Sequence, residues 1–393
     1  MATENNNKTL NVPNLRFPEF GGEWEKYRLK DIANISKERI GINMLSNNNY
    51  ISTENMKSDF GGVDVAINLP ASGNVIKFQK GDTLLSNIRP YLKKIWQAKC
   101  DGGCSADIFV FRSNILCNSD FLYYTLANEK FISYAMSGAK GVKMPRGDKE
   151  QILKYELHLP TTIEQNKITS FLSLLDERIA TQIKIIEKLE SLIRGLITDV
   201  NSGRIAQCKS VYLRDLLTEQ HEKNTNNYEV CSVSVSQGVI NQIDYLGRSF
   251  AAKEVLHYNV VNCGDIVYTK SPTGEFPYGI VKRSDITKPV AVSPLYGVYR
   301  PINDYVGRYL HLYFKSPINA KNYLHKLIQK GAKNTINITN QHFLDNKILI
   351  PEKGWLDKIV KFAAAIEMKI ATENKVLQTL QQQKDYLLSK MFI

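Results

Sequence analysis

The sequence predicts an α+β protein: two pseudo-repeated mixed α/β domains separated by two long helices that form an antiparallel coiled coil. Three observations support this. Two segments carry a sustained seven-residue apolar repeat, the regions between them share matched landmarks, and the chain has 393 residues. That length favours two or three domains with ample core.

The first predicted long helix covers residues 162–199, where apolar residues recur every seven positions in two rows offset by four. Such rows place apolar groups along one side of a helix, as in a coiled coil. Pro160 precedes the segment and Gly203 follows it, as is usual at helix starts and stops. The rows are Ile168, Leu175, Gln182, Leu189 and Leu196, and Leu172, Ile179, Ile186 and Ile193.

The second predicted long helix repeats these rows 191 residues later. Its rows are Ile359, Ile366, Glu373, Leu380 and Leu387, and Ala363, Ile370, Leu377, Lys384 and Met391. The polar interruption at Gln182 recurs at Glu373. Because a single polar residue in a coiled-coil seam can fix its register, we expect these two residues to set the register of the pair.

The remaining sequence predicts two mixed domains. Short apolar runs at 83–85 and 108–111, punctuated by glycines, indicate strands joined by turns. A helix is expected over 120–136, with counterpart helices within 306–327. The predicted organisation is a lead-in at 1–20, a mixed domain at 21–160, a long helix at 161–203, a second mixed domain at 204–351 and a second long helix at 352–393.

Four landmarks recur in the same order in both mixed domains. Residues 29–32 correspond to 213–216, 81–82 to 264–265, 105–112 to 293–300, and 138–140 to 331–333. The intervening sequence differs strongly. A repeated framework with divergent filling predicts two copies of one module that recognise two different things.

The composition favours a polyanionic partner, because the net charge is +12 and the pI is about 9.2. There is no run of 18 apolar residues, so we expect no membrane span. The polar N-terminal stretch does not resemble a signal peptide, which predicts a cytoplasmic location. Cys100 and Cys104 lie close together, but no second close pair completes a zinc site.

No catalytic motif emerges from the sequence. There is no Gly-x-Gly-x-x-Gly or Walker loop, no Asn/Asp-Pro-Pro-aromatic run, and no His-x-x-x-His pair. We therefore expect a non-catalytic chain that binds no metal and no cofactor of its own.

Basic loops with amide and aromatic residues are the candidate DNA contacts. Arg and Asn side chains can read base edges, Lys favours phosphates, and glycines allow close backbone approach. Such loops occur in pairs, one in each mixed domain, although each taken alone is equally consistent with a solvated turn. The candidate residues are Asn87, Arg89, Tyr91, Lys93, Lys94, Lys140, Lys143, Arg146, Lys270, Ser271, Thr273, Lys330, Lys333, Asn334 and Thr335.

These features resemble the specificity subunit of Type I restriction–modification systems over nearly the whole chain. The resemblance rests on residues 12–20 with Trp24, on Gly81-Asp82 before a strand, on the Leu-Pro after the first variable region, and on the long helix that follows each variable region. It implies that each mixed domain is a target recognition domain for one half of a split site in double-stranded DNA. It also implies that the paired helices act as a spacer.

The resemblance further implies partners for a subunit that lacks catalysis. These are methyltransferase subunits, which use S-adenosylmethionine, and a motor-nuclease subunit, which needs ATP and Mg²⁺. Arg178, Lys188 and Lys369 on the helices are candidates for docking the methyltransferase. Two alternatives stay open: a specificity subunit of a related two-component restriction system, and a coiled-coil scaffold whose two lobes bind proteins.

Overall fold

The computed structural model describes residues 11–247, 254–330 and 336–393. The chain divides into two compact units. Unit 1 comprises Met1–Gln182 with Val376–Ile393, and unit 2 comprises Ile183–Lys375. Within the described residues, every helix is too short or too polar to cross a membrane.

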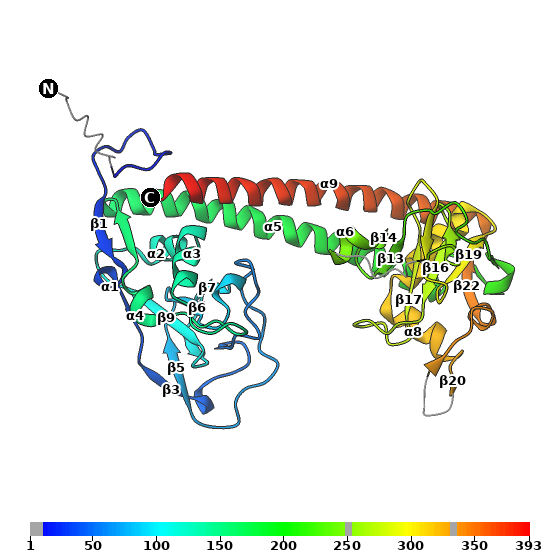
Figure 1. Cartoon of the computed structure of the whole chain (residues 1–393), viewed down its shortest axis with the longest axis horizontal. Helices are drawn as coiled ribbons and strands as arrows, with labels where there is room; N and C mark the ends of the chain where they lie inside the picture. Colours follow the sequence, from blue (N-terminus) through cyan, green and yellow to red (C-terminus); the bar gives the residue numbers. More distant parts are fainter. Residues whose placement is uncertain (1–10, 248–253, 331–335) are drawn as a thin grey trace. The chain divides into compact units, whose positions relative to one another are not determined.

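Unit 1 is built around an antiparallel four-stranded sheet with strand order β2-β9-β6-β7. Helix α2 packs against β6, β7 and β9 of this sheet (Figure 1). A second sheet has the order β3-β5-β8-β4, and β1 pairs with β10. The elements are β1 (Glu25–Arg28), α1 (Leu29–Ile32), β2 (Ala33–Ile35), β3 (Arg39–Gly41), η1 (Ile42–Met44), β4 (Tyr50–Ile51), β5 (Asn74–Phe78), β6 (Thr83–Ser86), η2 (Pro90–Leu92), β7 (Ile95–Gln97), β8 (Gly102–Cys104), β9 (Ile108–Ser113), α2 (Ser119–Leu126), α3 (Glu129–Ser137), α4 (Lys149–Ile152) and β10 (Glu156–Leu159).

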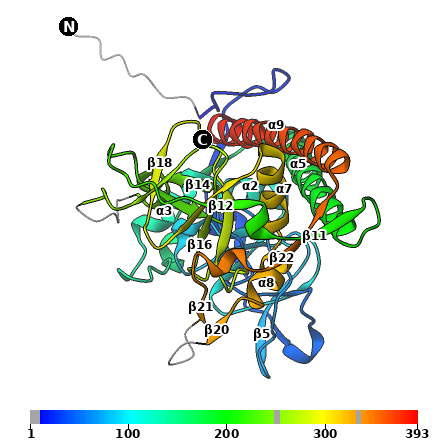
Figure 2. The ribbon, with the colours of Figure 1, turned by 90° about the vertical axis from the view of Figure 1, so that its right-hand side faces the viewer.

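Unit 2 repeats the same plan. Its four-stranded sheet has the order β12-β19-β16-β17, and β11 pairs with β22. Helix α7 packs on β17 and β19 and is followed by α8 (Figure 2). The elements are β11 (Cys208–Tyr212), η3 (Leu213–Asp215), β12 (Leu217–Glu219), β13 (Cys231–Ser234), β14 (Gly238–Asn241), α6 (Gln242–Leu246), β15 (Asn259–Val261), β16 (Ile266–Thr269), β17 (Ile280–Arg283), β18 (Val290–Val292), β19 (Gly297–Pro301), α7 (Asp304–Phe314), α8 (Pro317–His325), β20 (Gln329–Lys330), β21 (Ile336–Asn337), η5 (His342–Leu344) and β22 (Lys347–Pro351).

The matched sheet orders confirm the predicted repeat, and a buried corner repeats it in atomic detail. Gly81 and Gly264 both have φ of 92°. The buried Asp82 that follows Gly81 accepts a hydrogen bond from a backbone N–H three residues earlier and pairs with Arg112 at 2.9 Å. Asp265 makes the same backbone contact and pairs with Arg300 at 3.3 Å.

The two long helices are α5 (Thr162–Asn201) and α9 (Lys353–Met391), close to the predicted bounds. In unit 1, Leu172 near the start of α5 shares a core with Leu388 near the end of α9. In unit 2, Ile197 near the end of α5 shares a core with Ile359 near the start of α9. The helices therefore run antiparallel within each unit. All predicted seam positions are buried or half-buried, which confirms the seven-residue pattern.

One predicted helix is wrong in its extent. Residues 120–136 form two helices, α2 and α3, rather than one. The chain becomes extended at Asn128, whose side-chain oxygen accepts a hydrogen bond from the Lys130 N–H and so caps α3. The same amide donates to the Leu388 carbonyl at 3.1 Å, which holds this corner on α9 within unit 1.

Candidate nucleic-acid interface

Two of the predicted basic loops in unit 1 are joined by backbone hydrogen bonds. The loop after β6 contains Asn87 and Arg89. Arg89 N–H donates to the Pro145 carbonyl at 2.7 Å, and Gly147 N–H donates to the Asn87 carbonyl at 3.0 Å. These contacts place residues 87–94 and 140–147 side by side at the end of the β6–β7 hairpin. The sequence predicted both loops but gave no signal that they pair.

The second of these loops is a hairpin with an exposed tip. Lys140 and Arg146 exchange two backbone hydrogen bonds of 2.9 Å each. Lys143 at the tip is exposed, and so is the neighbouring Met144. The ammonium group of Lys140 pairs with Asp148 at 2.5 Å, and this hydrogen bond raises the pKa of Lys140. Among the described residues, Lys143 is therefore the exposed cation of this hairpin for which no ion pair is seen.

Arg89 and Asn87 occupy constrained positions. Arg89 has φ of 52°, in the left-handed region that residues other than glycine seldom adopt. Among the described residues, neither Arg89 Nε nor Asn87 Oδ1 has a hydrogen-bond partner, although both atoms are buried. Strained backbone and unsatisfied polar atoms are often found at functional sites. Tyr91, two residues further along, is 47% exposed.

Lys93, Lys94 and Arg146 already have partners within unit 1. Lys93 pairs with Glu129, which raises the pKa of Lys93. Lys94 Nζ donates to the Thr53 carbonyl at 2.6 Å. Arg146 is exposed, but it pairs with Asp107 at 3.0 Å. These three side chains anchor the loops, and a phosphate would compete with their existing contacts.

The corresponding loop of unit 2 follows β16 and exposes Lys270, Ser271 and Thr273. Thr273 and the buried Phe276 exchange two backbone hydrogen bonds of 3.1 and 2.9 Å, which close a tight turn. Partial burial lowers the pKa of Lys270. The loop is thus anchored by an aromatic side chain, whereas the loop of unit 1 is anchored by lysines.

The last group of predicted DNA contacts is only partly described. Lys330 lies in β20 and its backbone pairs with Ile336 of β21. This short hairpin lies, in chain order, where Lys140 and Arg146 form theirs in unit 1. The predicted contacts Lys333, Asn334 and Thr335 lie outside the described residues.

Both predicted register residues are at least half-buried. Gln182, the last residue of α5 in unit 1, is 7% exposed. Glu373 belongs to unit 2 and pairs with Lys369 one helical turn before it. Their joint role in setting the register stays a prediction. Of the predicted docking residues, Arg178 and Lys188 are exposed, and Lys369 is also engaged with Glu373.

Large apolar side chains on the outer faces of the long helices were missed by the sequence reasoning. They lie outside the two heptad rows. Because those rows mark the buried side of each helix, large apolar residues outside them could have been recognised as exposed from the sequence. In unit 1 they are Ile163, Phe171 and Leu174 of α5 and Val376 and Tyr386 of α9. In unit 2 they are Ile183, Ile185 and Leu192 of α5 and Phe362 and Met368 of α9.

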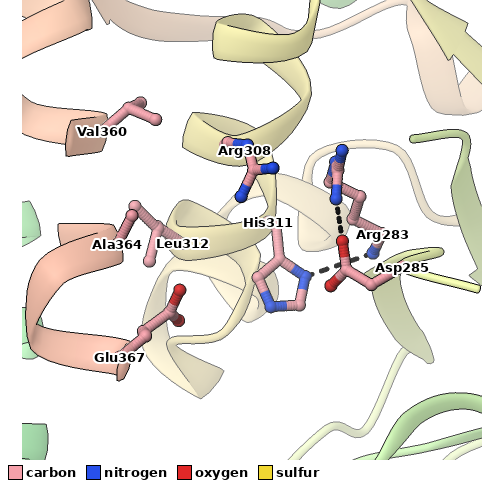
Figure 3. A pocket seen from close by; sticks show the side chains of 8 residues that line it. All are labelled: Arg283, Asp285, Arg308, His311, Leu312, Val360, Ala364 and Glu367. Carbon is pink, nitrogen blue, oxygen red and sulfur yellow. Dashed lines mark hydrogen bonds and ion pairs between the residues drawn. The ribbon is translucent and has the colours of Figure 1, made fainter. Parts of the chain in front are cut away.

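A charged pocket of about 200 Å³ in unit 2 is internally balanced (Figure 3). His311 Nδ1 accepts a hydrogen bond from the Arg283 N–H at 3.2 Å. The Arg283 guanidinium pairs with Asp285 and Asp304, and Arg308 also pairs with Asp304. Burial, reinforced by the neighbouring cations, lowers the pKa of His311 to about 3. These contacts explain the pocket as a brace between β17 and α7.

Metal-binding geometry is missing from the part of the chain that the structure describes, where no three His, Cys, Asp or Glu side chains come together as ligands. The close pair that the sequence singled out is split, because Cys100 is exposed and Cys104 is buried. Burial raises the pKa of the Cys104 thiol to about 12, which disfavours the thiolate that metals bind.

The chain is similar in sequence to specificity subunits of Type I restriction–modification systems. Residues 21–191 match the Type I restriction modification DNA specificity domain. The Escherichia coli EcoDI specificity subunit is 21% identical over 48% of this chain, and the match spans only 41% of that subunit. The Methanocaldococcus jannaschii MjaVIII specificity subunit is 24% identical over 92% of this chain and 88% of its own length.

Solved structures share the fold at low sequence identity. The crystal structure of a Type I S subunit from M. genitalium aligns with a TM-score of 0.57 and 14% identity, covering 97% of this chain and 99% of that one. A structure from a study of assembly and conformational transition of the Type I system aligns with a TM-score of 0.53 and 14% identity, covering 94% and 97%. Residues 21–191 therefore match a Type I restriction–modification DNA specificity domain, and the chain as a whole is similar to the specificity subunits of such systems.

Proposed function

We propose that this chain is a non-catalytic subunit that gives a restriction–modification complex its DNA sequence specificity. Each mixed domain, as a target recognition domain, reads one half of a bipartite site in double-stranded DNA. The paired helices set the spacing of the half-sites. The observation that carries the proposal is the joined pair of loops in unit 1, which brings Arg89, Tyr91 and Lys143 together at one end of the β2-β9-β6-β7 sheet.

The residue types at these loops suit a division of labour on DNA. Arg89 can form paired hydrogen bonds to a guanine edge, and its backbone is already fixed. The exposed Lys143 suits a phosphate, a contact that positions a protein without reading sequence. The net charge of +12 supplies the long-range attraction.

The exposed apolar faces of α5 and α9 support a protein partner as well. Apolar groups gathered on a polar surface commonly mark protein interaction sites. We propose that methyltransferase subunits dock there, and that a motor-nuclease subunit joins through the complex. S-adenosylmethionine, ATP and Mg²⁺ would then be used by those partners. A scaffold with two protein-binding lobes would share the apolar faces but would not need the basic loops.

A salt titration tests the DNA-binding proposal directly. Binding to random duplex DNA, with the methyltransferase present, should weaken by orders of magnitude between low and moderate salt. The reason is that binding releases cations from the DNA, and this release is less favourable when the surrounding salt concentration is higher. Lys143→Ala should reduce the slope of log affinity against log salt by about 0.9. Lys321→Ala, an exposed lysine on α8, serves as the matched control. Affinity that does not change with salt would favour the scaffold.

Co-purification tests the docking proposal. Leu192→Asp with Met368→Asp should abolish recovery with the methyltransferase subunit, because each places a charge on an apolar face. Ile115→Asp is the control, since Ile115 is 96% exposed but lies in the mixed domain of unit 1. Recovery of the double variant at the level of the control would contradict docking on this face. The genes beside the gene for this chain would also distinguish the two kinds of system. Separate genes for a methyltransferase subunit and a motor-nuclease subunit would indicate a Type I system rather than a two-component one.

A further inference from the structure

Unit 2 buries a lysine that the proposed function does not use. Lys282, on β17, is 3% exposed. Within the described part of the chain, its ammonium group makes no hydrogen bond or ion pair, and the charge that acts on it is that of Lys315. Burial lowers its pKa to about 8. A buried cation without a counter-ion is costly, so its presence calls for an explanation.

Lys282 lines a cavity of about 400 Å³ within unit 2, a size common for small-molecule sites. Apolar side chains form much of the lining: Ile193 and Ile197 of α5, Phe276, and Leu312 of α7. The other charged groups that line the cavity are Glu190, Arg194, Glu275 and Lys315.

Most of those other charges are already balanced. Arg194 lies 3.7 Å from Glu190, and Lys315 lies 3.5 Å from Glu367. Glu275 also lines the cavity but is exposed to solvent, and it is not among the groups that shift the pKa of Lys282. Lys282 is therefore the cation of this cavity whose charge is left over.

The internal repeat shows that the fold does not need a cation at this position. In unit 2, Lys282 pairs with Val267 across the β16–β17 ladder. The equivalent pair in unit 1 is Trp96 with Leu84. Trp96 packs edge-on against Phe78 at 6.0 Å and so uses its position for ordinary apolar packing. The lysine thus belongs to what is particular to unit 2 rather than to the shared framework.

We propose that this cavity binds a small amphipathic monocarboxylate, whose carboxylate pairs with Lys282 Nζ and whose apolar body packs against Ile193, Ile197 and Phe276. One unbalanced cation matches one negative charge, and the apolar lining matches a hydrocarbon or aromatic body. The proposal does not depend on the DNA-binding role. It nevertheless brings the ligand against Phe276, which anchors the turn carrying Thr273.

Calorimetry with the full chain tests this proposal. The probes are hexanoate, octanoate and benzoate, with octanamide as a neutral match for octanoate. Octanoate should bind at least about tenfold more tightly than octanamide, because a charge-assisted contact is lost in the amide. Lys282→Met should weaken octanoate binding by a similar factor, and Lys282→Arg should retain most of it. Lys321→Met should leave binding unchanged.

Two results would overturn the proposal. One is the absence of binding by all three carboxylates up to about 10 mM, and the other is equal binding by the unaltered chain and Lys282→Met. Thermal unfolding without ligand is the folding control, since removing an unpaired buried charge should not lower the melting temperature. If Lys282→Met fails to fold, the comparison of octanoate with octanamide on the unaltered chain decides, and equal affinity refutes the proposal.

Discussion

The two mixed domains share their strand order and backbone turns, but they differ in the side-chain contacts that join the sheet to the helix packed on it. Both have the same glycine–aspartate corner, with Asp82 paired to Arg112 and Asp265 to Arg300. In unit 1, Gln97 at the end of β7 donates a hydrogen bond to Asp120, in the first turn of α2. In unit 2 the equivalent strand position is Arg283, paired with an aspartate in the first turn of α7. The helix is fastened at the same point by different chemistry.

The hairpin turns of the two copies show the difference most clearly. The strand registers make Lys93 the equivalent of Gly279, in the turn that leads into the second strand of each hairpin. Both have positive φ, 52° for Lys93 and 101° for Gly279. The framework therefore demands a left-turning backbone there, but unit 1 fits a side chain and unit 2 does not. The two copies therefore share the backbone geometry of this turn and differ in how the surrounding atoms pack against it.

Of the substitutions considered, Gly279→Ala should lower the free energy of unfolding most. An added Cβ would lie 2.0 Å from the Thr269 carbonyl oxygen, and φ of 101° is unfavourable for alanine. We expect a loss of about 4 kcal/mol in the free energy of unfolding of unit 2, from backbone strain together with overpacking. Urea unfolding followed by Trp355 fluorescence, with Trp24 and Trp96 replaced by Phe, reports on this unit.

Gly274→Ala in the same loop is the matched control. Its φ is 52°, and nothing lies within 4 Å of the added Cβ, so the expected loss is about 1 kcal/mol. Lys93→Gly in unit 1 should change stability by no more than about 1 kcal/mol, because relief of the backbone offsets the lost surface ion pairs. A loss below 1 kcal/mol for Gly279→Ala would show that the two turns are interchangeable.

Replacing the aspartate of the shared glycine–aspartate corner should destabilise unit 1 more than unit 2. Asp82 accepts hydrogen bonds from Arg112 Nε and Nη2 at 3.0 and 2.9 Å. Asp265 accepts one from Arg300 Nε at 3.3 Å, and Arg300 is half-exposed. Because a better-buried and better-formed pair costs more to break, we expect losses of about 3 kcal/mol for Asp82→Ala and about 1–2 kcal/mol for Asp265→Ala.

Double-mutant cycles with Arg112→Met and Arg300→Met measure the same difference as coupling energies. The fluorescence of Trp24 and Trp96 follows unit 1 when Trp355 is replaced by Phe. Equal coupling energies in the two units would mean that the shorter contacts of Asp82 add nothing to stability.

Acid should destabilise unit 2 more than unit 1. The folded-state pKa of His311 is about 3, against about 6.5 for an unfolded histidine. Between these values the unfolded chain binds a proton that the folded chain does not, so stability falls as pH falls. We expect a loss on the order of 2–3 kcal/mol between pH 6.5 and 4, reduced in His311→Gln. The charged groups facing His311 are Lys282, Arg283, Arg308, Lys315 and Glu367.

His158 provides the comparison in unit 1. Burial lowers its pKa too, but it is less deeply buried than His311. The same titration followed through Trp24 and Trp96 should therefore show a shallower decline. Parallel declines in the two units, or an unchanged slope in His311→Gln, would assign the acid sensitivity to other groups.

The sequence predicted what depends on local pattern and missed what depends on distant contacts. The long helices follow from the spacing of apolar residues and from Pro160 and Gly203, which are all local signals. By contrast, Lys94 is occupied by the carbonyl of Thr53, and Arg89 is fixed by Pro145. Neither contact leaves a trace in the sequence around the loop, so the predicted DNA contacts could not be separated into anchors and free groups.

The distinction between anchoring residues and residues free to contact DNA leads to a last prediction, which concerns discrimination between bases. Arg89→Ala should relax specificity at one base position of one half-site by about 1–3 kcal/mol, because its backbone is fixed and a guanidinium group can pair with a base edge. Lys270→Ala should instead weaken binding to all sequences about equally, as loss of a phosphate contact would. Competition binding against a set of single-base variants of the methylated site distinguishes the two. If Arg89→Ala also weakens every sequence equally, the two copies contact DNA in the same way at this loop, and the strained backbone at Arg89 serves only to close it.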